Sequence, residues 1–180
     1  MATKITVVDI ETSHLSPKYG NILEIGIVTA DLDAGKIEEV FNSLIKENDT
    51  FNRDAWIFKN SNLKPEEIDD APSLESMREE IQEIFDKYPV TAFNSQFDYK
   101  FLKDRNFIIK NEAPCIMHKS SELLTPLCKS GRISEVQTYK TLFENPNYIE
   151  KHRAVDDAYE EAEIMLELHK RGAYDIEIKK

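Results

Sequence analysis

The sequence predicts an α/β domain in which helices flank a mixed central sheet. Three apolar runs rich in β-branched residues, at residues 5–12, 22–30 and 36–45, predict strands before any long helical pattern appears. Residues 31–35 (DLDAG) form turns readily and join the second and third runs in a hairpin, so part of the sheet is antiparallel. Helical patterns dominate the rest of the chain, which indicates helices packed around that sheet.

The composition fits a single domain over residues 1–180. With 41% apolar and 32% charged residues, the chain can bury one full core. The first strand follows the amino-terminal end almost at once, and no apolar run approaches membrane-spanning length. Cys115 and Cys128 lack metal-ligand spacing, which favours free thiols in a reducing compartment. We therefore expect a cytoplasmic protein without signal peptide or membrane contact; no pattern predicts its oligomeric state.

The remaining elements follow from caps and periodicity. Residues 48–70 are polar and favour short helices or loops, with Pro65 suited to a first helical turn. Ser73 is placed to cap a helix whose apolar positions recur at helical spacing as far as Phe85. A short strand and four further helices are expected at residues 90–94, 96–105, 113–128, 133–143 and from 154 onward.

Two acids close the first predicted strand. Asp9 and Glu11 are two residues apart, so their side chains leave the same face of an extended backbone. At about 4 Å and an effective dielectric near 20 two such charges repel by roughly 4 kcal/mol, so the pair needs a cation, a shared proton or water. Hard divalent cations fit best because they take oxygen ligands. An Asp-x-Glu pattern arises about once by chance in a chain of this length, so its partners decide its meaning.

The candidate partners are Asp98 and Asp157, each near the start of a predicted helix. His152 precedes Asp157 by five residues. Within a helix that offset would turn the two side chains about 140° apart, whereas a loop before the helix can bring the histidine across the same opening. A histidine there suits a base that takes a proton from water.

Three segments resemble, in order, the three motifs of the DEDDh group of DnaQ-like 3′-to-5′ exonucleases: residues 7–12 (VVDIET), 93–98 (FNSQFD) and 152–158 (HRAVDDA). Residues 21–26 (NILEIG) are similar to the second strand of that family. The resemblance extends over nearly the whole chain and implies a ribonuclease H-like fold.

The resemblance also implies the chemistry. Four acids would hold two Mg²⁺ or Mn²⁺ ions, with His152 as general base: Asp9, Glu11, Asp98 and Asp157. Such a site suits in-line cleavage of a phosphodiester, releasing nucleoside monophosphates from the 3′ end of single-stranded DNA or RNA. The enzyme would act alone or proofread for a polymerase subunit on another chain.

Substrate contacts follow the same resemblance. Thr12 and Leu15 would meet the 3′-terminal nucleotide, through a backbone amide and an apolar wedge respectively, while Asn94 would brace the site. Ser13 and His14 stand where the family commonly has Thr-Gly; His14 either adds a contact or is an exposed loop residue.

Basic and aromatic residues offer further contacts. Tyr99 and Phe101 are candidates for base stacking, although their place beside Leu102 in a helix favours core packing for at least one of them. Six basic residues are candidates for contacts with the phosphates of a single strand: Lys100, Lys103, Arg105, Lys119, Lys151 and Arg153.

Other classes of function compete with the exonuclease. The net charge of −11 argues against broad non-specific nucleic-acid binding, but bound cations can invert the field of an acidic site and attract phosphate. The acidic surface suits a catalytically silent nuclease-fold protein that acts as an interaction module, which the five intact catalytic-type residues disfavour. An acidic metal-binding protein without catalysis would be expected to carry a calcium-loop pattern, and the sequence has none.

Overall fold

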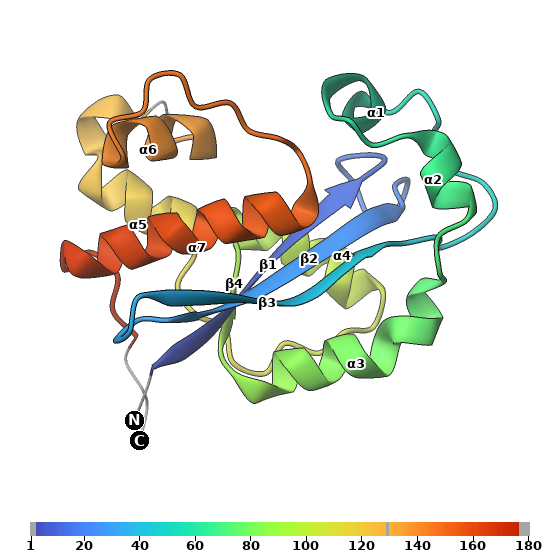
Figure 1. Cartoon of the computed structure of the whole chain (residues 1–180), viewed down its shortest axis with the longest axis horizontal. Coiled ribbons are helices and arrows are strands. Elements are labelled where there is room, and N and C mark those ends of the chain that lie inside the picture. Colours follow the sequence, from blue (N-terminus) through green and yellow to red (C-terminus); the bar gives the residue numbers. More distant parts are fainter. Residues whose placement is uncertain (1–2, 129, 177–180) are drawn as a thin grey trace.

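A mixed sheet in the order β3-β2-β1-β4 runs through the computed structural model, which describes residues 3–128 and 130–176 (Figure 1). Strand β1 pairs antiparallel with β2 and parallel with β4, and β2 pairs antiparallel with β3. The predicted hairpin is therefore confirmed. The strands are β1 (Lys4–Thr12), β2 (Ile22–Asp31), β3 (Lys36–Leu44) and β4 (Val90–Thr91).

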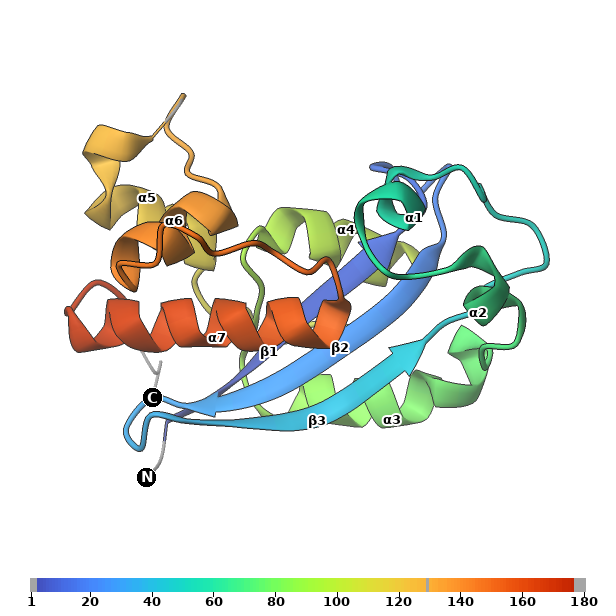
Figure 2. The same cartoon turned by 45° about the horizontal axis from the view of Figure 1, so that its top comes forward.

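Helices cover both faces of the sheet. Figure 2 shows α7 lying across β1 and β2 on one face, with α3 on the other. The helices are α1 (Trp56–Asn60), α2 (Pro65–Asp69), α3 (Leu74–Lys87), α4 (Ser95–Asp104), α5 (Ile116–Leu123), α6 (Glu135–Leu142) and α7 (Ala154–Lys170), with a 3-10 turn η1 (Thr125–Leu127).

The alternation of side chains along β1 decides which face receives the acids. Ile5 and Val7 lie in the core beneath α7, whereas Val8 and Ile10 lie in the core against α3 and α4. Because side chains alternate with a period of two, Asp9 and its neighbour two residues on belong to the α7 face. The strand therefore delivers its acids beneath the last helix.

The caps form as predicted around α2 and α3. Ser73 precedes α3, and its hydroxyl accepts a hydrogen bond from the backbone N–H of Ser76 at 3.2 Å. Pro65 is the first residue of α2, where its missing N–H costs nothing. Helix α3 ends at Lys87 and the chain becomes extended at Tyr88.

The strand expected at residues 90–94 is shorter because its last carbonyls have other partners. Ala92 and Phe93 accept hydrogen bonds from the N–H groups of Ile116 and Met117, at the start of α5. Ala113 in turn donates to the carbonyl of Val90, so the chain is still extended there. Helix α5 consequently begins later than residue 113.

Small residues let α7 approach the sheet, as the sequence predicts. Ala158 and Ala162 are fully buried beneath it. Strand β2 carries Gly26 at the crossing point, where a Cβ atom would lie 2.2 Å from the backbone carbon of Ala154. The start of α7 therefore rests directly on β2, and any larger residue at this glycine would displace it.

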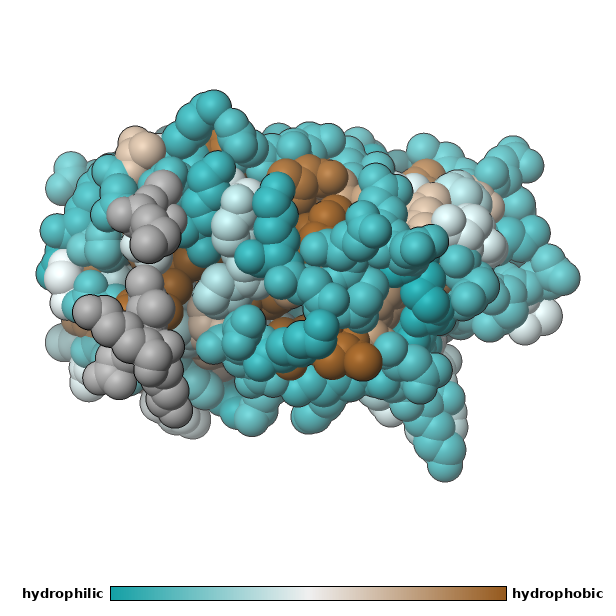
Figure 3. Space-filling model, turned by 90° about the horizontal axis from the view of Figure 1, so that it is seen from below, coloured by the Kyte–Doolittle hydropathy of each residue, from teal (hydrophilic) through white to brown (hydrophobic). Residues whose placement is uncertain are grey.

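The surface agrees with the largely hydrophilic composition. Viewed from the side of α3, the molecule is mostly hydrophilic, and hydrophobic residues appear in small separate groups (Figure 3). Among the described residues, the helices include none that is both long and apolar enough to cross a membrane. Cys115 and Cys128 are both free thiols, as expected.

Candidate active site

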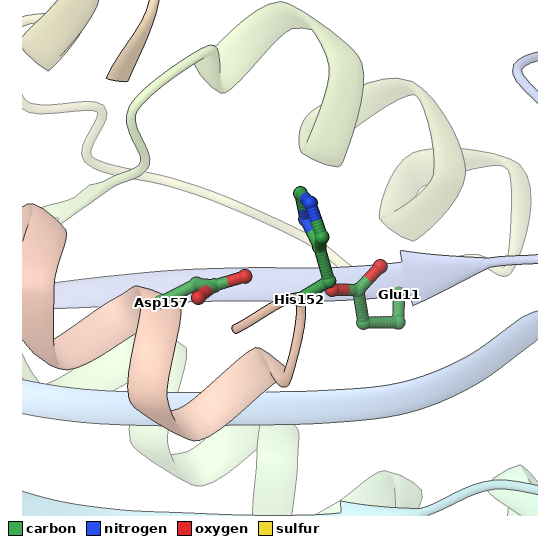
Figure 4. A group of neighbouring side chains, drawn as sticks. All are labelled: Glu11, His152 and Asp157. Atoms are coloured by element: carbon green, nitrogen blue, oxygen red, sulfur yellow. The ribbon is translucent and has the colours of Figure 1, made fainter. Parts of the chain in front are cut away.

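Three of the predicted site residues meet where α7 begins above the end of β1. Glu11, His152 and Asp157 each offer one ligand atom, and these atoms all lie within 4.8 Å of one another. Glu11 comes from the strand, His152 from the segment just before the helix, and Asp157 from its first turn (Figure 4). The loop before α7 therefore brings His152 close to Asp157, as the sequence predicts.

His152 is held by its backbone and by an aromatic neighbour. Its φ of 54° lies in the left-handed region, which is uncommon for a residue other than glycine. The indole of Trp56 meets the imidazole edge to face, with ring centroids 4.8 Å apart, and Glu150 Oε1 lies 3.4 Å from Nδ1. Edge-to-face aromatic pairs contribute roughly 0.5–1.5 kcal/mol, enough to bias the orientation of the imidazole.

The group does not include the other two predicted ligands, Asp9 and Asp98. Two of the four acids are deeply buried. Asp98 stands in the first turn of α4, and both Asp98 and Asp157 are only 3% exposed. One carboxylate oxygen of each, Oδ1, has no hydrogen-bond partner among the described residues. A buried ionised oxygen without a partner is costly, so each of these carboxyl groups needs either a proton or a cation.

Burial raises the pKa values of both acids, and neighbouring carboxylates add to this effect at Asp157. Burial raises the pKa of Asp98 to about 7, against the lowering effect of backbone hydrogen bonds at Asp98 and Ile10. Burial, with the charges of Glu150 and Glu160, raises the pKa of Asp157 to about 8.

The strand acids behave in the same way. Burial, followed by neighbouring carboxylates, holds the pKa values of Asp9 and Glu11 well above their usual range. Mg²⁺ and Mn²⁺ prefer oxygen ligands, and a set of carboxylates with unpartnered oxygens matches that preference. The residues present therefore fit divalent cations.

An ion pair fixes the start of α7 to β2. Arg153 donates to both carboxylate oxygens of Glu24, at 2.7–3.1 Å, and to Asn62 Oδ1 at 3.0 Å. Glu24 Oε2 also accepts from the backbone N–H of Ala154 at 3.2 Å. Because Arg153 directly follows His152, this pair sets the position from which the histidine projects. Arg153 therefore braces the site, and its candidacy as a phosphate contact is not supported.

A second ion pair fixes the loop that follows β1. Arg105 lies at the end of α4 and donates to Glu47 Oε1 at 2.8 Å. It also donates to the backbone carbonyls of Pro17, at 3.1 Å, and Gly20. Arg105 is thus used inside the protein, and it anchors residues 13–20 to α4.

The predicted substrate residues lie at the rim of the site. Leu15 is 84% exposed, and the hydroxyl of Thr12 donates to the carbonyl of His14 at 3.0 Å. The Nδ1 atom of His14 accepts from the backbone N–H of Ser16 at 3.0 Å, so this histidine helps to shape its own loop.

A hollow adjoins that loop. It has a volume of about 200 Å³ and brings Leu15 and Asn94 together with two basic residues, Lys100 and Arg132. The rest of its lining is Pro17, Gln96, Phe97 and Phe101. Two of the four predicted substrate residues therefore share one small concavity with positive charge.

The other candidate contacts are largely engaged elsewhere. Tyr99 and Phe101 are buried in the core, and the hydroxyl of Tyr99 donates to the carbonyl of Val90. Core packing, rather than base stacking, is the role that their burial supports. Three of the lysines form ion pairs, namely Lys103 with Glu112, Lys119 with Glu122 and Lys151 with Asp156.

Comparison with known proteins adds a family and a fold. An exonuclease family model, RNase_T, matches residues 6–165. The chain is 27% identical over 156 residues to the PolC-type DNA polymerase III of Mycoplasmopsis pulmonis. The aligned region covers 84% of this chain and 10% of that protein. The chain thus spans about a tenth of the length of the curated relatives it matches.

Two solved structures illustrate the fold. The nuclease domain of 3′hExo, a DEDDh family member bound to rAMP, has a TM-score of 0.73 and 14% identity, covering 99% of this chain and 98% of that chain. Escherichia coli Exonuclease I in complex with a dA16 oligonucleotide has a TM-score of 0.70 and 15% identity, covering 93% of this chain and 41% of that chain. The predicted ribonuclease H-like fold is confirmed.

Proposed function

Because the chain belongs to the RNase_T exonuclease family, we propose that it removes nucleoside monophosphates from the 3′ ends of single-stranded DNA or RNA by metal-dependent hydrolysis. The predicted enzyme class, a 3′-to-5′ exonuclease, agrees with this family and with its DEDDh structural neighbour. The single observation that carries the proposal is the meeting of Glu11, His152 and Asp157 within 4.8 Å, beside buried acids with unpartnered oxygens.

The acids are proposed as the ligands of two Mg²⁺ or Mn²⁺ ions. Bound there, such ions supply Lewis-acid stabilisation of the charge that develops on the attacking and leaving oxygens. Exonucleases of this group generally use divalent ions. The chain contributes carboxylates from three elements, β1, α4 and α7, so the ligands are held by packed structure: Asp9, Glu11, Asp98 and Asp157.

His152 is proposed as the general base. It stands at the mouth of the carboxylate cluster, with its side chain 24% exposed, so it can reach both the site and solvent. A base must come within hydrogen-bond reach of the water from which it takes a proton, and Trp56 and the Arg153–Glu24 pair hold the imidazole in place for that task.

The 3′ end is proposed to enter over Thr12 and Leu15. The exposed Leu15 side chain and the adjoining hollow, with Asn94, Lys100 and Arg132, offer an apolar contact, an amide and two cations for a terminal nucleotide. A single strand fits this arrangement better than a duplex, because its last base can be splayed away from its neighbour.

The relatives suggest the setting. They are PolC-type DNA polymerases, so proofreading for a polymerase in the cytoplasm is the physiological role we propose. A single domain over residues 1–180 remains a prediction.

Incubation with end-labelled single strands tests the proposal. Single-stranded DNA and RNA carrying the label at the 5′ end should shorten stepwise in Mg²⁺ or Mn²⁺ and stay intact in chelator. Asp98→Asn, which removes one charge and keeps the shape, should abolish the ladder. Intact substrate under every metal condition would favour the alternative, a catalytically silent nuclease fold that acts as an interaction module.

A further inference from the structure

A fifth acid lies on the face of α7 that carries Asp157. Glu161 follows Asp157 by four residues, and residues at that spacing are neighbours on one face of a helix. Its side chain is only 2% exposed, and its Oε2 atom has no hydrogen-bond partner among the described residues. Burial raises the pKa of Glu161 well above the usual range, although a hydrogen bond from the backbone of Phe93 favours its ionised form. A buried acid in this state needs either a proton or a cation.

The geometry of α7 and β1 points Glu161 toward Asp9. The helix begins near the end of β1 and runs in roughly the opposite direction, crossing the strand obliquely (Figures 1 and 2). One turn of four residues advances about 6 Å along a helix, and two residues advance about 6.6 Å along a strand. Since ligand atoms of Asp157 and Glu11 lie within 4.8 Å at the strand end, the next turn of the helix should carry Glu161 toward the acid two residues earlier, Asp9.

The charges agree with these matched positions. After burial, Glu161 is the charge that raises the pKa of Asp9 most, and Asp157 is the charge that raises the pKa of Glu11 most. Glu135, at the start of α6, is the strongest charge on Glu161, and its own Oε1 atom is also buried without a partner among the described residues. Glu161 therefore adds to the negative potential around Asp9, and Glu135 adds to the negative potential around Glu161.

We propose that Glu161 is a fifth carboxylate ligand of the metal site, binding a divalent cation together with Asp9. This inference rests on the proposed function, because it adds a residue to the same metal site. A cation bound there would offset the repulsion among Asp9, Glu161 and Glu135. It would also give Glu161 Oε2 the partner that it lacks.

Titration with Mn²⁺, followed by calorimetry and by the electron paramagnetic resonance signal of the free ion, tests the proposal on the whole chain. Glu161→Gln keeps the size of the side chain and removes one charge, and it should raise the dissociation constant for Mn²⁺ at least tenfold. Glu79→Gln removes one charge from an exposed position on α3 and should leave the dissociation constant within twofold of the wild type.

A third variant separates the two proposals. Asp98→Asn should weaken Mn²⁺ binding if the proposed metal site exists at all. Weak binding by Asp98→Asn with unchanged binding by Glu161→Gln would overturn the role of Glu161 alone and leave it a buried, protonated acid. Unchanged binding by both would overturn the metal site itself. If Glu161→Gln has a lower melting temperature than the wild type in chelator, Glu161→Asp supplies the test. This variant keeps the charge but moves the carboxylate away from the site, so it should still weaken Mn²⁺ binding. Unchanged Mn²⁺ binding by Glu161→Asp would also count against the ligand role.

Discussion

Each of the two sides of the candidate site is held in place by an arginine–glutamate ion pair, and the two pairs fix different parts of the site. On one side, the Arg153–Glu24 pair ties the start of α7 to β2 and thereby positions His152. On the other, the Arg105–Glu47 pair ties the loop of residues 13–20 to the end of α4. The first pair supports the proposed general base, and the second supports the loop that we propose receives the substrate. Because the two pairs share no residue, we expect mutations to separate catalysis from substrate binding.

The two sides also differ in how well their polar groups are satisfied. The floor of the site is formed by the four acids proposed as metal ligands. Two of them, Asp98 and Asp157, each have a carboxylate oxygen without a hydrogen-bond partner among the described residues. At the rim, Thr12, His14 and Ser16 satisfy one another through local hydrogen bonds. The buried oxygens of the floor therefore need a proton or a cation, whereas the polar groups of the rim already bind one another, and we expect changes at the floor to cost more activity.

The largest effect is expected at His152. His152→Ala should lower turnover by about a hundredfold or more, the range of a lost general base, while binding of Mn²⁺ and of an oligonucleotide stays near the wild-type level. Trp56→Leu serves as a matched variant, since it removes the aromatic neighbour but keeps the imidazole, and should lose less. Single-turnover rates and equilibrium binding measure the two quantities. A folded His152→Ala protein with full activity would remove the histidine from the mechanism.

Breaking the floor-side pair should affect turnover more than substrate affinity. Glu24→Gln leaves Arg153 without its charge partner, and loss of one partner of a buried pair costs about 3 kcal/mol of folding stability. We expect kcat to fall about tenfold or more with KM changed less than threefold, because the histidine is displaced while the rim is intact. Steady-state kinetics below the melting temperature measures this split. A rise in KM at constant kcat would contradict the assignment.

Breaking the rim-side pair should produce the opposite split. Arg105→Leu frees the loop carbonyls of Pro17 and Gly20, so residues 13–20 lose their anchor. KM for a short single strand should rise several-fold, while kcat at saturation falls less than threefold. If Arg105→Leu and Glu24→Gln gave the same pattern, the two sides would not be separable.

The smallest effect is expected at His14. The ring of this residue binds the backbone of its own loop, so it shapes the rim and has no partner at the floor. His14→Gly should leave kcat/KM within about tenfold of the wild type, equivalent to about 1.4 kcal/mol of transition-state binding. A larger loss, measured with the same oligonucleotide, would make His14 a substrate ligand.

The acids of the candidate site could be selected from the sequence, whereas the residues that hold the site in place could not. Asp98 and Asp157 were identifiable because an acid in the first turn of a helix follows a strand or loop in a recognisable pattern. The strand acids were identifiable from the period of two along β1. These signals are local, so they survive in the sequence without knowledge of the packing.

The supports depend on contacts between distant residues. Arg153 and Glu24 are 129 residues apart, and Arg105 and Glu47 are 58 apart, so only the packed structure pairs them. Trp56 lies in a polar segment with no pattern that predicts contact with His152. The end of β4 was likewise misplaced, because its carbonyls are taken by the start of α5.

Thermal melting with and without Mn²⁺ tests the central claim, that the carboxylate floor requires a cation. In chelator, the raised pKa values of Asp98 and Asp157, about 7 and about 8, mean that the folded protein keeps protons that the unfolded chain releases near pH 4. Stability without metal should therefore fall as the pH rises from about 5 to 8. Saturating Mn²⁺ should raise the melting temperature by about 5 °C or more at pH 8, and by less at pH 6, where protons compete for the same oxygens. Equal melting temperatures with Mn²⁺ and with chelator at pH 8 would contradict the account.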